Sequence, residues 1–152
     1  MKHLKKFNES DLPDFTLKRE IASEIKEMTE DILLDLKDID PEYYYTVRCN
    51  TSAENDMEHI KNELNKPISW VSIVIKNKNK PEISDYKPVI DRLINYYASE
   101  NIKPSRYFSI NFDRGKDLDP VTYTLERFYI LDMTFEYEWV KYLLSRPPSK
   151  EN

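Results

Sequence analysis

The stretch Asp38–Asn50, DIDPEYYYTVRCN, contains the end of a helical pattern, a proline step and the start of a strand pattern. Before it, apolar residues recur every three or four positions, which indicates a helix over residues 15–36. Proline disfavours helical backbone in the residue before it, and the β-branched and aromatic residues 43–50 are typical of a strand. Six apolar residues form the expected buried stripe of the helix: Leu17, Ile21, Ile25, Met28, Ile32 and Leu36.

A second stretch, residues 101–113, NIKPSRYFSINFD, repeats this pattern. It follows a helical pattern over 84–99, passes through an Ile-X-Pro step and enters a predicted strand over 106–113. Two explanations are open: any helix–proline–strand junction resembles this one, or the chain consists of two helix–strand–strand units. Two such units would form a mainly antiparallel four-stranded sheet with two long helices on one face. That is an α+β plait, a permuted ferredoxin-like arrangement.

The remaining patterns complete the α+β prediction. Residues 68–76, ISWVSIVIK, form the clearest strand pattern. Residues 113–117, DRGKD, are predicted as a hairpin-like turn that leads into a strand over 121–131. Short extra helices are predicted over 53–64 and 134–145. The second of these would carry four apolar residues on one side: Phe135, Trp139, Tyr142 and Leu143.

Length and charge predict one acidic domain with a basic leader. A chain of 152 residues fits a single domain, and its net charge is −5. The first residues are basic, and the helical pattern starts only after Pro13. We therefore divide the chain into a basic leader (1–13), a single α+β domain (14–146) and a polar tail (147–152).

Composition excludes several classes of site. Gly115 is the one glycine, so the glycine-rich loops that hold nucleotide phosphates are excluded. Cys49 is the one cysteine, so an intrachain disulfide and a thiolate metal cluster are excluded as well. No apolar run approaches the ~18–20 residues of a membrane span. We expect no cofactor, no membrane association and a cytoplasmic location.

No catalytic or metal-binding motif is recognisable. The two histidines, His3 and His59, have no second ligand at a suitable spacing. Asp113 and Asp117 lie close together, but lysine and arginine separate them, which favours a solvated turn. We therefore expect no enzyme, and retain a metal-dependent hydrolase using Asp113, Asp117 or Glu126 as a further alternative.

A sheet face is the candidate binding surface. If both helices cover one face, the other face would display aromatic rings and a cation: Tyr44, Arg48, Trp70, Tyr107 and Phe128. Three interpretations are open. The last predicted helix could cover this face, a protein partner or a second copy could bind it, or single-stranded nucleic acid could stack on it. The acidic net charge argues against nucleic acid.

The first nine residues, MKHLKKFNE, resemble the short Met-Lys-x-x-x-x-Phe-x-Glu leaders of internal and scaffold-associated proteins of large tailed phages. They are also similar to leaders of uncharacterised marine tailed-phage proteins. The resemblance implies delivery into the prohead and cleavage after the glutamate, which marks Lys2, Phe7 and Glu9. The chain departs from the pattern at Phe7, where the protease prefers an aliphatic residue. An inert basic start is the alternative.

The sequence thus predicts a non-enzymatic interaction protein, and the resemblance of its first residues implies a phage-encoded protein that is virion-associated or an accessory factor. It would bind a protein partner, or a second copy in a homodimer, and would reside in the host cytoplasm or the virion. A single-stranded nucleic-acid-binding domain that uses the same face is the alternative.

Overall fold

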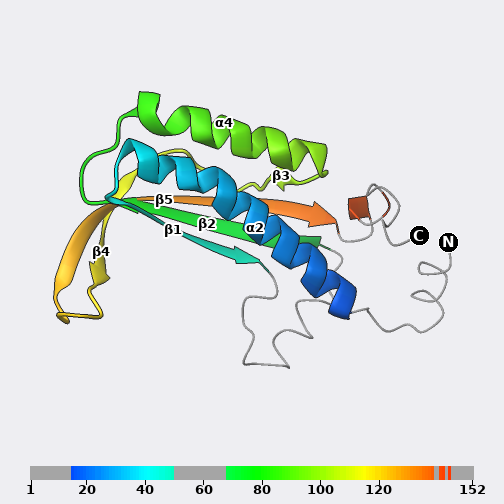
Figure 1. The fold of residues 1–152 in the computed structure, drawn as a ribbon, viewed down its shortest axis with the longest axis horizontal. Helices are drawn as coiled ribbons and strands as arrows, with labels where there is room; N and C mark the ends of the chain where they lie inside the picture. The colour runs from blue at the N-terminus through cyan, green and yellow to red at the C-terminus, as the bar shows by residue number, and fades with distance from the viewer. Residues whose placement is uncertain (1–14, 50–67, 139–140, 143, 145–152) are drawn as a thin grey trace.

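The computed structural model describes residues 15–49, 68–138, 141–142 and 144. Its elements in chain order are α2 (Phe15–Ile39), β1 (Tyr43–Cys49), β2 (Ile68–Asn77), α4 (Ile83–Ser99), β3 (Lys103–Pro104), β4 (Asp113–Leu118) and β5 (Leu125–Glu138). Both helices lie on one side of a single sheet (Figure 1). The α+β class, the antiparallel sheet and the two long helices agree with the sequence prediction.

Each long helix buries one stripe of side chains. The stripe of α2 has the spacing of three or four that places residues on one helical face. Met28, which the sequence pattern assigns to this stripe, is 43% exposed, and the neighbouring Thr29 is buried instead. The helix is therefore rotated slightly from the predicted orientation. The buried residues of α4 are Tyr86, Val89, Ile90, Leu93 and Tyr97.

Hydrogen bonds of Asp40 fix the step from α2 to β1. Its backbone N–H donates to the carbonyl of Leu36 (3.0 Å), and its carbonyl accepts from the N–H of Tyr43 (3.1 Å). Its carboxylate accepts from the backbone N–H of Glu42 (2.9 Å) and from the side-chain amide of Asn77 (3.1 Å). These bonds to the charged form lower the pKa of Asp40, the bond from Glu42 most of all. The proline step is thus a specific turn that places β1 beside β2.

The sheet contains five antiparallel strands in the order β1-β2-β5-β3, with β4 also paired to β5. Both β3 and β4 lie along the edge of β5 opposite β2. Pro104 of β3 is opposite Phe135, and Asp113 of β4 is opposite Ile130. The predicted count of four strands is therefore wrong, because the expected third strand is replaced by two separate strands.

The predictions for residues 106–117 are wrong in detail. Residues 106–112 form a loop between β3 and β4 rather than a strand. Residues 113–117, predicted as a turn, lie in β4 and pair in regular register with residues 126–130 of β5. The turn of the hairpin comes later, between Leu118 and Leu125.

The prediction for the C-terminal region also needs correction. β5 covers residues 125–138, so the predicted helix over 134–145 is wrong up to residue 138. Met133, Phe135 and Tyr137 are buried, whereas Thr134 and Glu136 between them are partly exposed, which is the alternation of a strand. Residues 141, 142 and 144 are helical. The leader 1–13, the predicted helix 53–64 and the tail 147–152 lie outside the described residues.

Aromatic rings form the contact between the helices and the sheet. Phe135 of β5 contacts Tyr97 of α4 and Phe108 of the β3–β4 loop, with ring centroids 4.5 and 5.2 Å apart. Phe112 in the same loop contacts Tyr86 of α4 at 4.8 Å. Edge-on ring pairs at these distances add to the stabilisation from buried area. The loop is therefore anchored on the helix side of the sheet.

One buried polar contact joins the two helices. The Thr29 hydroxyl of α2 donates to the carbonyl of Ile25 (2.6 Å) and lies 2.5 Å from the Tyr97 hydroxyl of α4. Since the single Thr29 proton is used for Ile25, the Tyr97 hydroxyl donates to Thr29. Both side chains are fully buried, and burial raises the pKa of Tyr97 strongly. The tyrosine is therefore a neutral donor throughout the physiological range.

We expect Thr29→Val to destabilise the protein by about 1–3 kcal/mol, because the Tyr97 hydroxyl then loses its buried acceptor. In a Tyr97→Phe background the same substitution should cost markedly less, since no donor remains to be satisfied. Urea unfolding of the four proteins measures this coupling. Equal costs in both backgrounds would show that the hydrogen bond contributes nothing.

Candidate binding surface on the open face of the sheet

The strands alternate between a face covered by the helices and a face turned away from them. On β2 every second residue, from Ser69 to Asn77, is buried. Tyr44 is opposite Lys76, and Lys76 is opposite Ile130, so the alternation extends across β1 and β5. No described helix covers the other side, which we call the open face (Figure 1). It carries Tyr44, Thr46, Arg48, Trp70, Ser72, Val74, Lys76, Phe128, Ile130, Asp132, Thr134 and Glu136.

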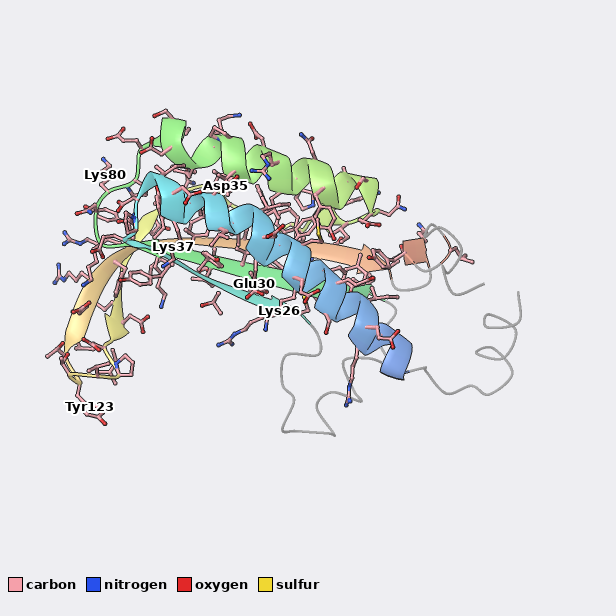
Figure 2. All side chains as sticks on the ribbon, viewed as in Figure 1. Lys26, Glu30, Asp35, Lys37, Lys80 and Tyr123 are labelled. Carbon is pink, nitrogen blue, oxygen red and sulfur yellow. The ribbon has the colours of Figure 1, made fainter. Side chains whose placement is uncertain are left out.

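Aromatic rings and cations gather at one end of the open face. The rings of Tyr44 and Phe128 meet edge-on, with centroids 6.3 Å apart. Lys37, at the end of α2, places its Nζ 4.5 Å from the centre of the Tyr44 ring (Figure 2). The Nζ of Lys76 lies 5.8 Å from the centre of the Phe128 ring and forms an ion pair with Asp117. These contacts hold the rings of Tyr44 and Phe128 in defined positions.

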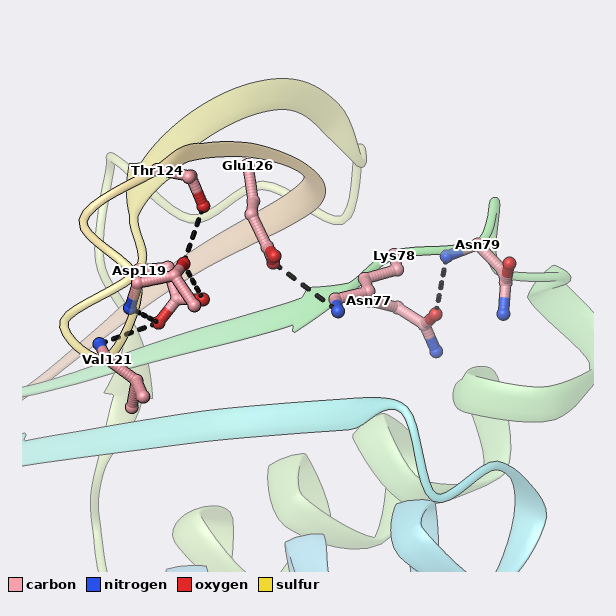
Figure 3. Close-up of polar contacts among 8 residues, drawn as sticks. Asn77, Lys78, Asn79, Asp119, Val121, Thr124 and Glu126 are labelled. Atoms are coloured by element: carbon pink, nitrogen blue, oxygen red, sulfur yellow. Dashed lines mark hydrogen bonds and ion pairs between the residues drawn. The ribbon is translucent and has the colours of Figure 1, made fainter.

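Ion pairs extend from this end of the sheet into the β4–β5 hairpin. Lys78, directly after β2, lies 3.4 Å from the carboxylate of Glu126 on β5 (Figure 3). The hydrogen bond and the charge of Glu126 raise the pKa of Lys78. The amide side chain of Asn77 is beside this pair and accepts from the N–H of Asn79 at 2.7 Å. The ion pair therefore joins the end of β2 to the hairpin, and the Asn77 hydrogen bond orders the backbone directly after β2.

Arg48 and Trp70 lie toward the other end of the open face. Arg48 is exposed and opposite Ser72, while Trp70 is half-buried and opposite Glu136. The central positions between the two ends are polar or small, with Thr46 exposed on β1. The open face thus has aromatic residues at both ends, and Arg48 adds an exposed cation at the Trp70 end.

Of the five predicted surface residues, the structure brings four to the open face and places the fifth elsewhere. Tyr44, Arg48, Trp70 and Phe128 occupy alternate positions that point away from the helices. Tyr107 lies in the β3–β4 loop, 63% exposed, with the Arg106 guanidinium 4.8 Å from its ring centre. Tyr107 therefore does not belong to the open face. The predicted leader residues Lys2, Phe7 and Glu9 lie outside the described residues.

Sequence reasoning did not identify the residues that order the rings. Lys76 is six residues after Trp70 on β2, so both side chains lie on the same face of the strand. Its place on the open face could therefore be predicted from the strand pattern. Its partner Asp117 could not be identified, because the sequence predicts residues 113–117 as a turn. Lys37 contributes from a helix, and no local pattern connects it with Tyr44.

Two of the three acidic residues that we considered for metal chemistry, Asp117 and Glu126, form ion pairs with lysines, while Asp113 lies at the start of β4. Asp117 pairs with Lys76, and Glu126 pairs with Lys78. In the described part of the chain no group of three or more His, Cys, Asp or Glu side chains is placed to hold a metal ion. The arrangement of these carboxylates is that of a charged surface network.

Two hollows lie along the helices. One, of about 430 Å³, lies between the end of α2 and the start of α4, where Arg92 pairs with Asp35. The other, of about 650 Å³, is lined by residues of α2 and of the C-terminal half of α4, among them Glu27, Asp31 and Tyr96. Both are shallow features of the helix layer with acidic walls.

No protein-family model matches the chain, and neither a curated protein nor a solved structure matches it. Among the described residues no helix is both long enough and apolar enough to span a membrane. Function must therefore be inferred from the geometry of the chain itself.

We expect the Cys49 thiol to be unreactive in the folded protein. Burial raises its pKa to about 12, so the thiolate is scarce at pH 8. Against a free thiol with a pKa of about 8.5, alkylation by iodoacetamide should be slower by on the order of a thousandfold, and urea should restore it. Labelling of the folded protein at the free-thiol rate would show that Cys49 is accessible.

Proposed function

We propose that this protein is a non-enzymatic interaction protein that binds a protein partner through the open face of its sheet. The observation that carries the proposal is the placement of Tyr44, Arg48 and Trp70 on a face that no described helix covers. Tyrosine, tryptophan and arginine are the residue types that contribute most to protein interfaces. An extended sheet surface with aromatic residues at both ends suits a protein surface better than a small ligand, which usually binds in a cleft.

The charges of the open face favour a protein over a nucleic acid. Arg48 is its exposed cation, while the second cation, Lys76, is already paired with Asp117. Asp132 in the middle of the same face and Glu136 at its Trp70 end add two carboxylates. Phosphate backbones require a net excess of cations, and this face does not provide one. A protein partner with charges of both signs is complementary to it.

The local chemistry favours binding over catalysis. Asp117 and Glu126 are neutralised by lysines, and the Cys49 thiol is buried and protonated. Groups in such states serve structure better than proton transfer or nucleophilic attack. These features support a non-enzymatic role.

The strand order supports a permuted ferredoxin-like plait as the underlying fold. The first half of the chain has the order helix–strand–strand and the second half has a helix followed by three strands; the last strands of the two halves, β2 and β5, are adjacent in the centre of the sheet. In this interpretation β3 and β4 together occupy one edge position, opposite β1. The likeness of residues 1–9 to tailed-phage leaders supports a phage-encoded, virion-associated or accessory protein as the setting.

A cross-linking experiment tests the proposal. A photo-reactive amino acid at Thr46, exposed on the open face, should give a discrete protein adduct in the native host cell. The same group at Asn95, exposed on α4, should not. Arg48→Glu combined with Trp70→Ala should weaken binding of the cross-linked partner at least tenfold, since hot-spot residues each contribute about 2 kcal/mol or more.

Arg106→Glu combined with Tyr107→Ala is the matched control, because it changes the same kinds of residue away from the open face. It should leave binding unchanged. Equal losses for the two double variants, or adducts from Asn95 alone, would rule out the open face as the binding surface. Salt-sensitive quenching of tryptophan fluorescence by oligonucleotides, absent in Arg48→Glu, would assign the face to nucleic acid instead.

A further inference from the structure

The β4–β5 hairpin forms an arm that extends beyond the rest of the sheet. β2 pairs with β5 only as far as Tyr129, whereas β4 continues to pair with β5 down to Leu125. Residues 125–128 of β5 are therefore paired with β4 alone. The hairpin bends away from the two helices at the end of the domain (Figure 1). We call residues 113–130 the arm.

Hydrogen bonds order the tip of the arm. The carboxylate of Asp119 accepts from the backbone N–H of Val121 (2.8 Å) and from the hydroxyl of Thr122 (2.7 Å). Across the turn, the N–H of Asp119 donates to the carbonyl of Thr124 (2.7 Å), and Tyr123 adopts a left-handed φ of 59°. The contacts from Thr122 and Val121 lower the pKa of Asp119, so the turn is held by a carboxylate that stays charged (Figure 3).

This ordered tip exposes large apolar side chains. Tyr123 lies at the outer end of the arm (Figure 2). The exposed fractions are 53% for Leu118, 82% for Val121, 79% for Tyr123 and 70% for Leu125. Leu118 and Leu125 are directly opposite each other, and Val121 and Tyr123 lie in the turn between them. Several exposed apolar side chains on an ordered projection are typical of an interaction site, because a preformed surface loses little entropy on binding.

The two faces of the arm differ in charge. One face carries Asp117 and Glu126, which are paired with lysines of the sheet. The other face carries Lys116 directly opposite Arg127, and neither cation forms an ion pair with a described residue. Like charges opposite each other in a strand pair are destabilising. Carboxylates of a partner would relieve this repulsion.

The same chain presents a complementary surface at its other end. The hollow of about 650 Å³ between α2 and α4 has Met28 and Tyr96 in its lining, together with carboxylates of Glu27, Asp31 and Glu100. None of these three carboxylates forms an ion pair with a described residue. Glu27 and Asp31 are four residues apart on one helix, where like charges also repel. The hollow is therefore complementary to the arm: its apolar lining suits the exposed apolar side chains of the tip, and its carboxylates suit the cations Lys116 and Arg127.

We propose that the arm of one copy binds the acidic hollow between α2 and α4 of a second copy. The arm lies at the end of the domain where α2 ends and α4 begins, and the hollow includes the last turn of α4, so one molecule cannot make the contact with itself (Figure 1). Each copy uses its arm toward one neighbour and its hollow toward another. Such a head-to-tail contact is heterologous: it forms a ring where the rotation between copies closes and an open assembly where it does not, and association rises with concentration in both cases.

This association is distinct from partner binding through the open face. Sedimentation velocity of the full chain over a concentration series, at low and high salt, is the test. We expect wild-type protein to associate at low salt and to dissociate as salt screens the charges. Tyr123→Ser with Leu125→Ser removes the arm contact, and Glu27→Gln, Asp31→Asn and Glu100→Gln together remove the hollow contact. Each set should weaken association at least tenfold.

Mixing the two variants gives the decisive result. One supplies an intact hollow and the other an intact arm, so the mixture should form a one-to-one pair and nothing larger. Arg48→Glu should associate like the wild type, which separates this contact from the open face. The substituted side chains are on the surface, and unchanged urea midpoints verify the fold.

Three outcomes would overturn the proposal: a wild type that stays monomeric at low salt, an arm variant that still associates, or a mixture that remains monomeric. If the monomeric wild type instead binds vesicles of anionic lipid, or an oligonucleotide, and the arm variant does not, the arm is a binding site for that ligand and not for a second copy.

Discussion

β2 pairs with β5 along its whole length, from Ile68 opposite Glu138 to Asn77 opposite Tyr129. This single register decides which side chains of both strands meet the helices and which lie on the open face, since a shift of one residue would exchange the two sets. It also decides where β5 leaves β2, and thereby how much of β5 remains for the arm. The core, the candidate surface and the projecting hairpin are thus consequences of one antiparallel contact.

The segments that sequence reasoning placed well are those whose periodicity has one interpretation. The helical spacing before Pro41 and the apolar run from Ile68 left little choice, and both elements occur where expected. The segment 134–138 was ambiguous. Phe135, Trp139 and Tyr142 fit helical spacing, but Phe135 and Tyr137 also fit strand spacing, and pairing with β2 favoured the strand. A long-range contact decided a question that the local pattern left open.

The error at Gly115 has a different cause. A glycine between charged residues is typical of a turn, yet here it lies in β4 opposite Phe128. A β-carbon at this position would come within 2.5 Å of the Cδ1 atom of Ile130, so the glycine provides room for a side chain of the neighbouring strand. The open-face residues on β1 and β2 could be predicted from strand parity alone. The position of Tyr107 could not be predicted. Its expected strand is replaced by a loop, and the course of that loop is determined by the packing of Phe108 and Phe112 against the core.

The order of charges along β4 also has a consequence for aggregation. Among the described strands β4 pairs with β5 alone, so its outer edge could serve as a template for another strand. Two β4 strands that paired antiparallel about Gly115 would bring Arg114 opposite Lys116 and Asp113 opposite Asp117. Centring the pair on Lys116 instead would oppose two lysines. Like charges across a strand pair repel, so these pairings of two β4 strands are unfavourable. The exposed edge of the arm is thereby protected against edge-to-edge association into fibrils.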